Sequence, residues 1–235
     1  MKKFISFILT ALFVFPVSMV LVSCGSAGAD VIFKPELSYR SPNLDFTKVE
    51  AIAIMPVNCY SNEVPEITSL VNDGLASELK RSQTAWKIFS CDEVLRKLNE
   101  AGLGRGYQNY IADLNTFVTA AGMTPNFTSE TYKFFDDLKK EMNFQAILFT
   151  SYGFTTETVT EHSTLNVLFG GSGQVAVEKK RLSVTVVLYD LSTHRTWWVS
   201  KLSLQGNMDL TNVELSQKVV EGIVNYFGKG DLRQL

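Results

Sequence analysis

Strand-length apolar runs alternate with amphipathic helical stretches early in the chain, and this order restricts the fold more than any other feature. Residues 49–57, VEAIAIMPV, are almost continuously apolar, as expected for a strand covered on both faces. A helical repeat of apolar residues begins at Pro65, a short strand follows at residues 86–89, and Ser90 with Glu93 forms a capping-box pattern before a second helix. Strands that alternate with helices predict a parallel sheet.

The second half of the chain changes character. Two further helices are expected between residues 103 and 143, and a buried strand at residues 144–154. Three long, alternating, Thr- and Val-rich segments then predict antiparallel strands, at residues 155–169, 175–189 and 195–205. A closing helix is expected at residues 211–227. We therefore predict a mixed α/β fold with a parallel start and antiparallel strands in one sheet packed by helices.

The N-terminus has the composition of a secretory signal peptide, predicted at residues 1–23. Lys2 and Lys3 form a basic start, residues 4–22 are largely apolar, and Ser23 is a small residue before the break. An uncleaved transmembrane anchor is the alternative, because a span needs about 20 apolar residues. Several polar residues and Pro16 within the run argue against that alternative.

Residues 21–24, Leu-Val-Ser-Cys, resemble the bacterial lipobox, whose cysteine is diacylated and becomes the mature N-terminus. This resemblance implies lipidation at Cys24, which would anchor the chain in a membrane. Gly25 stands where an acidic retention residue would stand in enteric sorting, so we expect the outer membrane, with the domain in the periplasm. The domain prediction is a lipidated tether at residues 24–48 and a single α/β domain at residues 49–235.

The composition supports one folded domain and excludes one class of partner. Of 235 residues, 46% are hydrophobic, which is enough for a substantial core. The net charge of −2 and the lack of a basic patch argue against nucleic-acid binding.

Beyond Cys24, the chain has two cysteines, Cys59 and Cys91. An even pair in an exported protein favours a disulfide. If the first two strands are parallel neighbours, both cysteines leave the sheet at the same edge, close to disulfide spacing. Two buried thiols that never meet are the alternative.

The usual carriers of catalysis are weak in this sequence. His162 and His194 have no neighbours at metal-ligand spacing, so no metal, cofactor or catalytic residue is predicted. Residues 102–106, GLGRG, follow a predicted helix and lack a Gly-Lys-Ser/Thr, so we interpret them as a helix stop and a mobile loop. Alternation would place Trp197 and Trp198 on opposite faces, one in the core and one available to a partner.

The layout of residues 49–227 resembles the periplasmic α/β domain of the curli-secretion channel lipoprotein, the lipoprotein activators of penicillin-binding proteins and the TolB N-terminal domain. The resemblance rests on three segments, residues 52–57, residues 146–150, and residues 186–190 with the turn to Trp198. It implies an envelope lipoprotein that works through protein contacts and has no catalytic site. The tether is shorter than the activators require, and only one hairpin, at residues 164–177, matches the two membrane-inserting hairpins of the curli channel. The arms of that hairpin are short for a transmembrane strand of about 9–11 residues, which favours a solvent- or partner-facing hairpin.

Three functions remain open from the sequence. The favoured one is a lipid-anchored envelope protein that binds an unidentified envelope protein, in assembly, export or cell-wall work. A homo-oligomeric secretion-channel or ring subunit is the second. A ligand binder or enzyme with an unrecognised site is the third.

Overall fold

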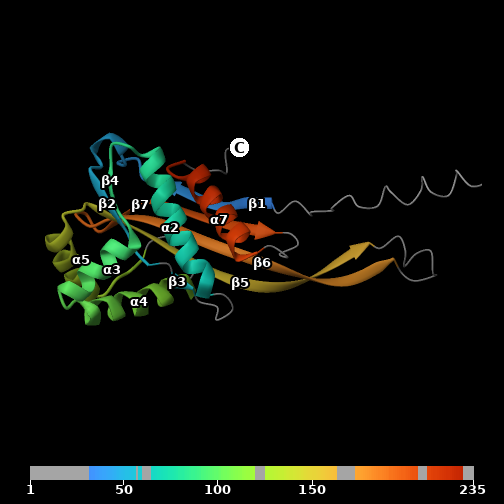
Figure 1. The fold of residues 1–235 in the computed structure, drawn as a ribbon. Helices are drawn as coiled ribbons and strands as arrows, with labels where there is room; N and C mark the ends of the chain where they lie inside the picture. The colour runs from blue at the N-terminus through green and yellow to red at the C-terminus, as the bar shows by residue number, and fades with distance from the viewer. Residues whose placement is uncertain are drawn as a thin grey trace, which may run out of the picture. The chain divides into compact units, whose positions relative to one another are not determined.

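The computed structural model describes residues 32–56, 58–59, 65–119, 125–162, 173–205 and 211–229. Strands and helices alternate in the first part of this region, and long strands dominate the second (Figure 1). In chain order the elements are β1 (Ile32–Arg40), η1 (Phe46–Lys48), β2 (Ala51–Ile54), β3 (Asn58–Cys59), α2 (Pro65–Ser82), β4 (Lys87–Phe89), α3 (Cys91–Glu100), α4 (Gly104–Thr119), α5 (Ser129–Met142), β5 (Ala146–His162), β6 (Gln174–Asp190), β7 (Arg195–Gln205) and α7 (Asn212–Tyr226).

The described strands form one mixed sheet in the order β1-β7-β6-β5-β2-β4, with β3 also paired to β5. The pairs β2–β4, β2–β5 and β3–β5 are parallel. The pairs β5–β6, β6–β7 and β1–β7 are antiparallel. The predicted fold class, a parallel start followed by antiparallel strands in one sheet, is confirmed.

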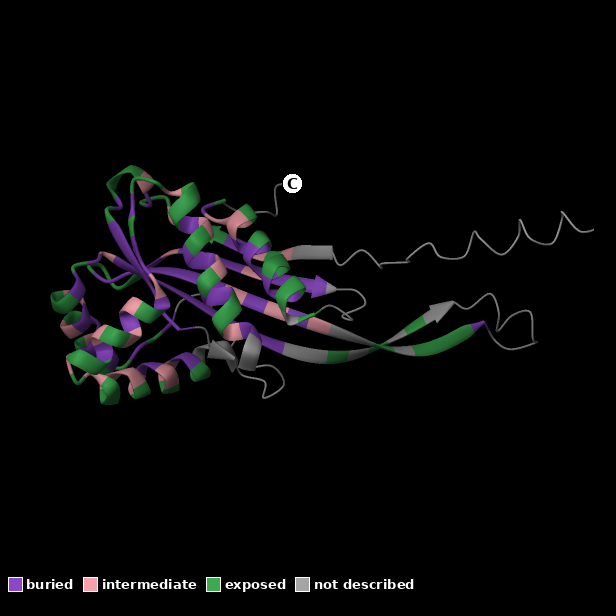
Figure 2. Cartoon of the chain, viewed as in Figure 1, coloured by how far each residue is buried: buried purple, intermediate pink, exposed green. Residues whose placement is uncertain are grey.

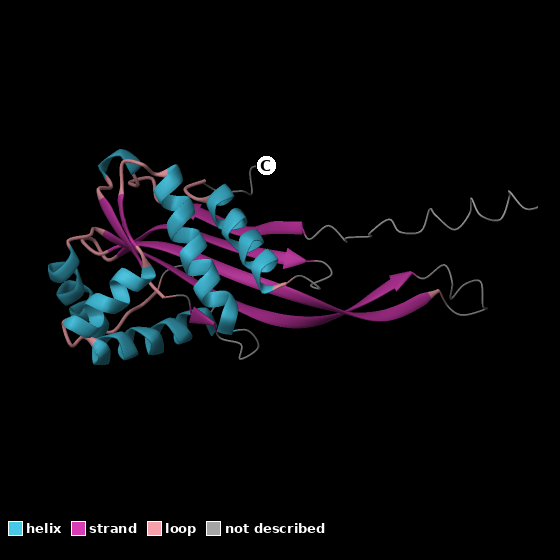
Figure 3. Ribbon diagram, viewed as in Figure 1, coloured by secondary structure: helices cyan, strands magenta, loops and turns pink. Residues whose placement is uncertain are grey.

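Helices cover both faces of the sheet, α2 and α7 on one and α3, α4 and α5 on the other (Figure 3). The predicted strand at residues 49–57 explains this arrangement, because its alternate residues enter different cores. Ile52 and Ile54 pack with α2 and α7, while Ala53 and Met55 pack on the opposite side. The purple sheet of Figure 2 shows the resulting burial.

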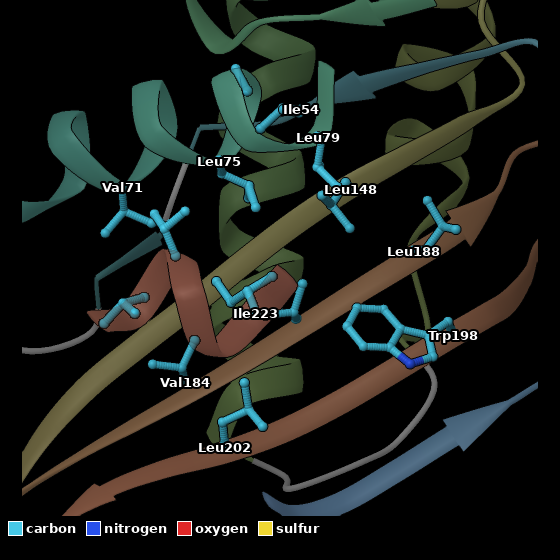
Figure 4. Close-up of a cluster of buried hydrophobic side chains, with 14 of the residues drawn as sticks. Ile54, Val71, Leu75, Leu79, Leu148, Val184, Leu188, Trp198, Leu202 and Ile223 are labelled. Atoms are coloured by element: carbon cyan, nitrogen blue, oxygen red, sulfur yellow. The ribbon is translucent and has the colours of Figure 1, made fainter. Parts of the chain in front are cut away.

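The α2–α7 core is largely aliphatic. Figure 4 shows Val71, Leu75 and Leu79 of α2 and Ile223 of α7 pointing toward Leu148, Val184, Leu188 and Leu202 of the strands, with Trp198 at one side. The opposite core is aromatic and centres on Tyr110, whose ring lies 5.5 Å from that of Phe135 and 6.4 Å from that of Phe149. Complete burial raises the pKa of Tyr110 well above its ordinary value.

The helix boundaries agree with the local sequence signals. Ser90 accepts a hydrogen bond from the Glu93 amide, and the Glu93 carboxylate accepts one from the Ser90 amide, so the predicted capping box is confirmed. Thr211 and Glu214 form a second capping box at α7. None of the helices in the described ranges combines the length and apolar character that a membrane span requires.

The first strand differs from the prediction. Residues 32–40, which the sequence analysis placed in the tether, form β1 and pair with β7 at the edge of the sheet. Pro35 lacks an amide hydrogen and is tolerated because β1 has a neighbour on one side only, and the register shifts beside it, between Pro35 and Leu37. The domain therefore begins earlier than predicted, near residue 32.

Two further boundaries also differ. Residues 146–162 form one continuous strand, β5, where two strands meeting near residue 154 were expected. The predicted mobile loop at residues 102–106 is wrong beyond Gly102, because α4 begins at Gly104. Gly102 does end a helix, with φ of 66°. Gly106 is needed inside α4, because a Cβ there would lie 2.8 Å from the Cβ of Phe134.

Trp198 is fully buried, as predicted for one of the two tryptophans. Trp197 is partly buried and packs against the same α2–α7 core, so the expectation of opposite faces is wrong. The reason is a register shift opposite Leu188 and Tyr189, which leaves Trp197 without a register partner on β6.

Candidate functional site

β1 is the first described element after Cys24, and it begins at one end of the sheet. Ile32 of β1 pairs with Gln205 of β7, and Gln205 pairs with Arg181 of β6. These three residues form one row across the sheet, called here the basal row. Residue 24 precedes Ile32 by eight residues, so a lipid on Cys24 would be covalently tied to this end of the sheet.

Glu36 links β1 to β6 and β7 beside the basal row. Its carboxylate forms ion pairs with Arg181 of β6 and with Lys201 Nζ of β7, the latter at 3.1 Å. Glu36 lies between Pro35 and Leu37, where the register shifts. These side chains are partly exposed, so each pair is worth roughly 0.2–1 kcal/mol.

β5 and β6 continue past the basal row as a two-stranded arm. The arm comprises residues 156–162 and 174–180, which pair from Thr156–Lys180 to His162–Gln174. In the part of the chain that the structure describes, no other strand pairs with these residues. Figure 1 shows the ribbon of β5 and β6 extending beyond the ends of β1 and β7.

The described side chains of the arm are exposed (Figure 2). They include Thr156, Thr158 and Thr160 on β5 and Ala176 on β6, which share one face by the strand register. Val175 is an exposed apolar residue on the opposite face. Residues 164–172 of the predicted hairpin lie outside the described residues.

A groove of about 410 Å³ lies between α2 and α7, the helices that cover one face of the sheet. Gly74 permits the helices to approach closely, because a Cβ there would lie 3.0 Å from Val220 Cγ2. The charged groups in the groove are Glu78, Arg81 and Glu221. Arg81 forms an ion pair with Glu78, so these two charges are already matched within the chain.

A smaller pocket, about 210 Å³, lies at the end of the sheet opposite the arm, beside the β6–β7 turn. Trp197 lines it together with Asp45 and Asp190. Both carboxylates are occupied by local structure, since Asp45 accepts from Thr47 and Asp190 accepts from the Ser192 and Thr193 amides. The two carboxylates of this pocket therefore stabilise the local turns.

Cys91 carries a free, buried thiol in the structure, where the sequence predicted a bridge to Cys59. Burial raises the pKa of Cys91 to about 11, with smaller contributions from Asp92 and Asp73. The side chain of Cys59 lies outside those that the structure describes. The strands β2 and β4 are parallel neighbours as predicted, but Cys59 belongs to β3, which continues along β5. Cys59 therefore lies further along the sheet than the sequence argument assumed, and the bridge stays a prediction.

The two histidines have different surroundings. His194 lies in the β6–β7 turn with φ of 54°, and its ring stacks on Tyr132 at 4.3 Å. The side chain of His162 is not among those described. Within the described ranges, no group of three or more His, Cys, Asp or Glu residues is placed to hold a metal ion. Cys24 and the predicted signal peptide also lie outside the described residues.

Comparisons with known proteins do not assign the chain to a family. No protein-family model matches the chain, and no curated protein matches it. Among solved structures, a PelC dodecamer from Paraburkholderia phytofirmans is similar with 10% identity and a TM-score of 0.43, over 82% of this chain and 96% of that chain. Lipoprotein GNA1162 from Neisseria meningitidis is similar with 16% identity and a TM-score of 0.35, over 77% of this chain and 99% of that one.

The protein CT253 from Chlamydia trachomatis is similar with 13% identity and a TM-score of 0.39, over 75% of this chain and 97% of that one. One of these three similar structures is thus a lipoprotein. Likeness at this level carries no argument about function. The resemblance to the curli, activator and TolB proteins is not shown by these comparisons and stays an expectation.

Sequence reasoning missed the arm and the Glu36 ion pairs. The alternation at residues 155–162 and 174–180 indicated that these strands pair. The arm extends beyond the rest of the sheet because β7 ends at Gln205, and the sequence does not reveal this end point. Glu36 gave no signal, because Arg181 and Lys201 are far from it in the chain. Only the position of β1 in the sheet brings the three charges together.

Proposed function

We propose that the protein is a lipid-anchored protein of the bacterial outer membrane, held at Cys24, whose periplasmic domain acts by binding another envelope protein. The observation that carries the proposal is the Leu-Val-Ser-Cys motif at residues 21–24, after a basic and apolar signal segment. The early start of β1 supports it, because a short tether joins the predicted lipid site to an ordered domain.

Binding is favoured over catalysis by where the perturbed groups lie. Burial raises the pKa values of Cys91, Tyr107 and Tyr110, and Tyr110 belongs to the packed aromatic core. The two pockets offer matched or locally occupied charges, which suits a structural role. The exposed surfaces available to a protein partner include the arm and the α2–α7 face, where Leu70 and Val213 are exposed apolar residues.

The experiment compares the full chain with Cys24→Ala in bacteria fed an alkyne-bearing fatty acid. We expect label on the wild-type protein and flotation with outer membranes, and neither for Cys24→Ala. A mature-size Cys24→Ala protein that still floats and carries label would overturn lipidation at this residue. As a matched control, Cys91→Ala should leave labelling unchanged, because Cys91 is a buried residue of α3.

A photo-crosslinking amino acid at Thr158 on the arm or at Ser77 on α2, both exposed, then tests for a partner. We expect a crosslinked product of defined mass from at least one position, identified by mass spectrometry of the purified product. Crosslinks at neither position, in a protein that floats normally, would contradict binding through these surfaces.

A ring or channel subunit is the second candidate, favoured by the arm, whose outer strand edges pair with no other described strand. Size measurement on the acylated protein in detergent separates the two candidates. A ring-forming protein elutes as one large, symmetric species, whereas the favoured function predicts a smaller one.

A further inference from the structure

The smaller pocket, beside the β6–β7 turn, contains neutral polar groups that make no hydrogen bond within the described chain. Its volume is about 210 Å³, and its lining includes Trp197 and Asn43 besides the carboxylates of Asp45 and Asp190. Drug-sized ligands occupy pockets of about 300–1,000 Å³, so this pocket has room for a single ring. All of its lining residues lie within the described ranges.

Trp197 reaches this pocket because of an irregularity in β7. Its two neighbours in β7 pair with successive residues of β6, Leu188 and Tyr189, so Trp197 is the extra residue of a β-bulge. Bulges re-aim a side chain, and they are frequent next to active sites. Trp197 is only partly buried, whereas Trp198 is fully buried in the core. The bulge therefore places an accessible indole ring in the wall of the pocket.

The indole N–H of Trp197 differs from those of the other two tryptophans. Trp86 and Trp198 donate from Nε1 to backbone carbonyls inside the protein, at 3.1 Å and 3.2 Å. In the part of the chain that the structure describes, the indole of Trp197 donates to no other residue, and neither does the side-chain amide of Asn43. Both groups therefore have donors available to a ligand in the pocket.

The charges of the pocket argue against an ion as the ligand. Asp45 accepts from Thr47 and forms an ion pair with Lys48 at 3.4 Å, so its charge is matched. Asp190 is 3% exposed and accepts from two amides of the β6–β7 turn. An anion would be repelled by these two carboxylates, and a cation would compete with the groups that already bind them. The pocket therefore suits a neutral ligand.

The remaining groups combine hydrogen bonding with an aromatic surface. Trp197 and Asn43 supply N–H donors, and Oδ1 of Asp190, which accepts one bond from the Ser192 amide, has capacity for a second. A hydroxyl group suits all three, because it both donates and accepts. The face of an indole packs against apolar C–H groups. A sugar ring has this combination, with hydroxyls around its rim and C–H groups on its faces.

We propose that this pocket binds one neutral sugar ring, with the indole of Trp197 against one face of the ring and Asn43 and Asp190 hydrogen-bonded to its hydroxyls. The ring belongs either to a free monosaccharide or to the end unit of a glycan, since both present this chemistry. The site goes beyond the proposed function and does not depend on a lipid at Cys24.

The test follows the three indole N–H resonances of the full acylated chain, labelled with ¹⁵N-tryptophan, by NMR. The detergent must lack a sugar headgroup, so lauryldimethylamine oxide is used. The probes are glucose, galactose, mannose, N-acetylglucosamine and their methyl glycosides. At least one of these sugars should move the Trp197 resonance to saturation and leave those of Trp86 and Trp198 in place. The variant Trp197→Phe identifies the resonance by its loss.

Two further comparisons test the chemistry. The uronate of the best-binding hexose carries a carboxylate on the ring and should bind at least about fivefold more weakly, because Asp45 and Asp190 repel it. Asn43→Ala should weaken binding of the neutral sugar several-fold, since it removes a donor. Asn99→Ala is the matched control, because Asn99 is an exposed asparagine of α3 outside the pocket, and it should leave the affinity unchanged.

The outcomes are distinct. Binding of methyl glycosides as well as reducing sugars supports the end unit of a glycan, and binding of reducing sugars alone supports a free monosaccharide. The proposal is overturned if none of the sugars moves the Trp197 resonance at up to about 100 mM, or if all three resonances move together. Equal binding of hexose and uronate, or equal affinities of Asn43→Ala and Asn99→Ala, would also overturn it. Each of these failures leaves the lipid anchor and the partner binding of the proposed function untouched.

Discussion

Replacing Gly106 with alanine tests how tightly α4 packs against α5. The added Cβ would lie 2.8 Å from both Cβ and Cδ2 of Phe134, which is shorter than van der Waals contact. A rotamer change cannot relieve the contact, because the Cβ of Phe134 is fixed to the backbone of α5. The two helices must separate, within a core where Phe134 also packs against Tyr110 and Phe135.

Two opposing effects set the magnitude. Overpacking of this kind costs about 1–3 kcal/mol. Alanine in place of glycine returns up to about 1 kcal/mol through helix propensity. We therefore expect Gly106→Ala to lower the free energy of unfolding by up to about 2 kcal/mol.

Gly104→Ala is the matched control, because nothing lies within 4 Å of a Cβ at this position of the same helix. It should be neutral or stabilising, so the two variants should differ by about 1–3 kcal/mol. In thermal unfolding of the acylated chain in mild detergent, followed by circular dichroism, this corresponds to roughly 3–10 °C in Tm. The packing argument is wrong if Gly106→Ala melts at or above Gly104→Ala.

Four further predictions concern single side chains. Ser90→Ala should lower the stability by about 1 kcal/mol through loss of the α3 cap, measured as Tm against the exposed control Ser77→Ala, and an equal Tm would contradict it. The hydrogen bond from the Ser90 amide lowers the pKa of Glu93 in the folded protein. The stability that the ionised Glu93 contributes is therefore present above its pKa in the unfolded chain and is lost as the pH falls through its pKa in the folded protein. The difference in Tm between the wild type and Glu93→Gln should accordingly close in acid. Burial raises the pKa of the Cys91 thiol to about 11, so it should react slowly with iodoacetamide at pH 8 unless the protein is unfolded. Alkylation of the unfolded protein without reductant, followed by mass spectrometry, also tests the disulfide. If both Cys59 and Cys91 are alkylated, the disulfide is excluded. Glu36→Gln should accelerate amide hydrogen exchange in β1 but not in β2, and unchanged exchange in β1 would show that its ion pairs contribute nothing.

The fold class could be predicted from the sequence because its signals are local. Ser90 and Glu93 are three residues apart, and the cap that they form needs no other part of the chain. The apolar run at residues 51–55 is buried on both faces, as its composition indicates. Thr- and Val-rich alternation likewise marked β6 and β7 as antiparallel strands.

The errors occurred where a distant contact decides the structure. β1 depends on β7, because Ile32 pairs with Gln205, which lies far away in the sequence. The glycines at 104 and 106 suggested a loop, whereas Gly106 is required by the approach of Phe134 from α5. Trp197 and Trp198 pack on one core because the register shifts opposite Leu188, which alternation alone does not reveal.

The same long-range pairing determines how a load on the tether would reach the domain. If Cys24 carries a lipid, a pull on the tether acts at Ile32 and loads the hydrogen bonds of β1 to β7 from this end of the strand. The far end of β1 is held separately, because Arg40 donates to the carbonyls of Gly228 and Leu44 and Ser38 Oγ donates to the carbonyl of Lys229. Glu36 divides the strand, since residues 32–35 precede its ion pairs and have one neighbouring strand. These four residues should therefore release first, which lengthens the chain between Cys24 and the sheet from eight residues to twelve without unfolding the sheet.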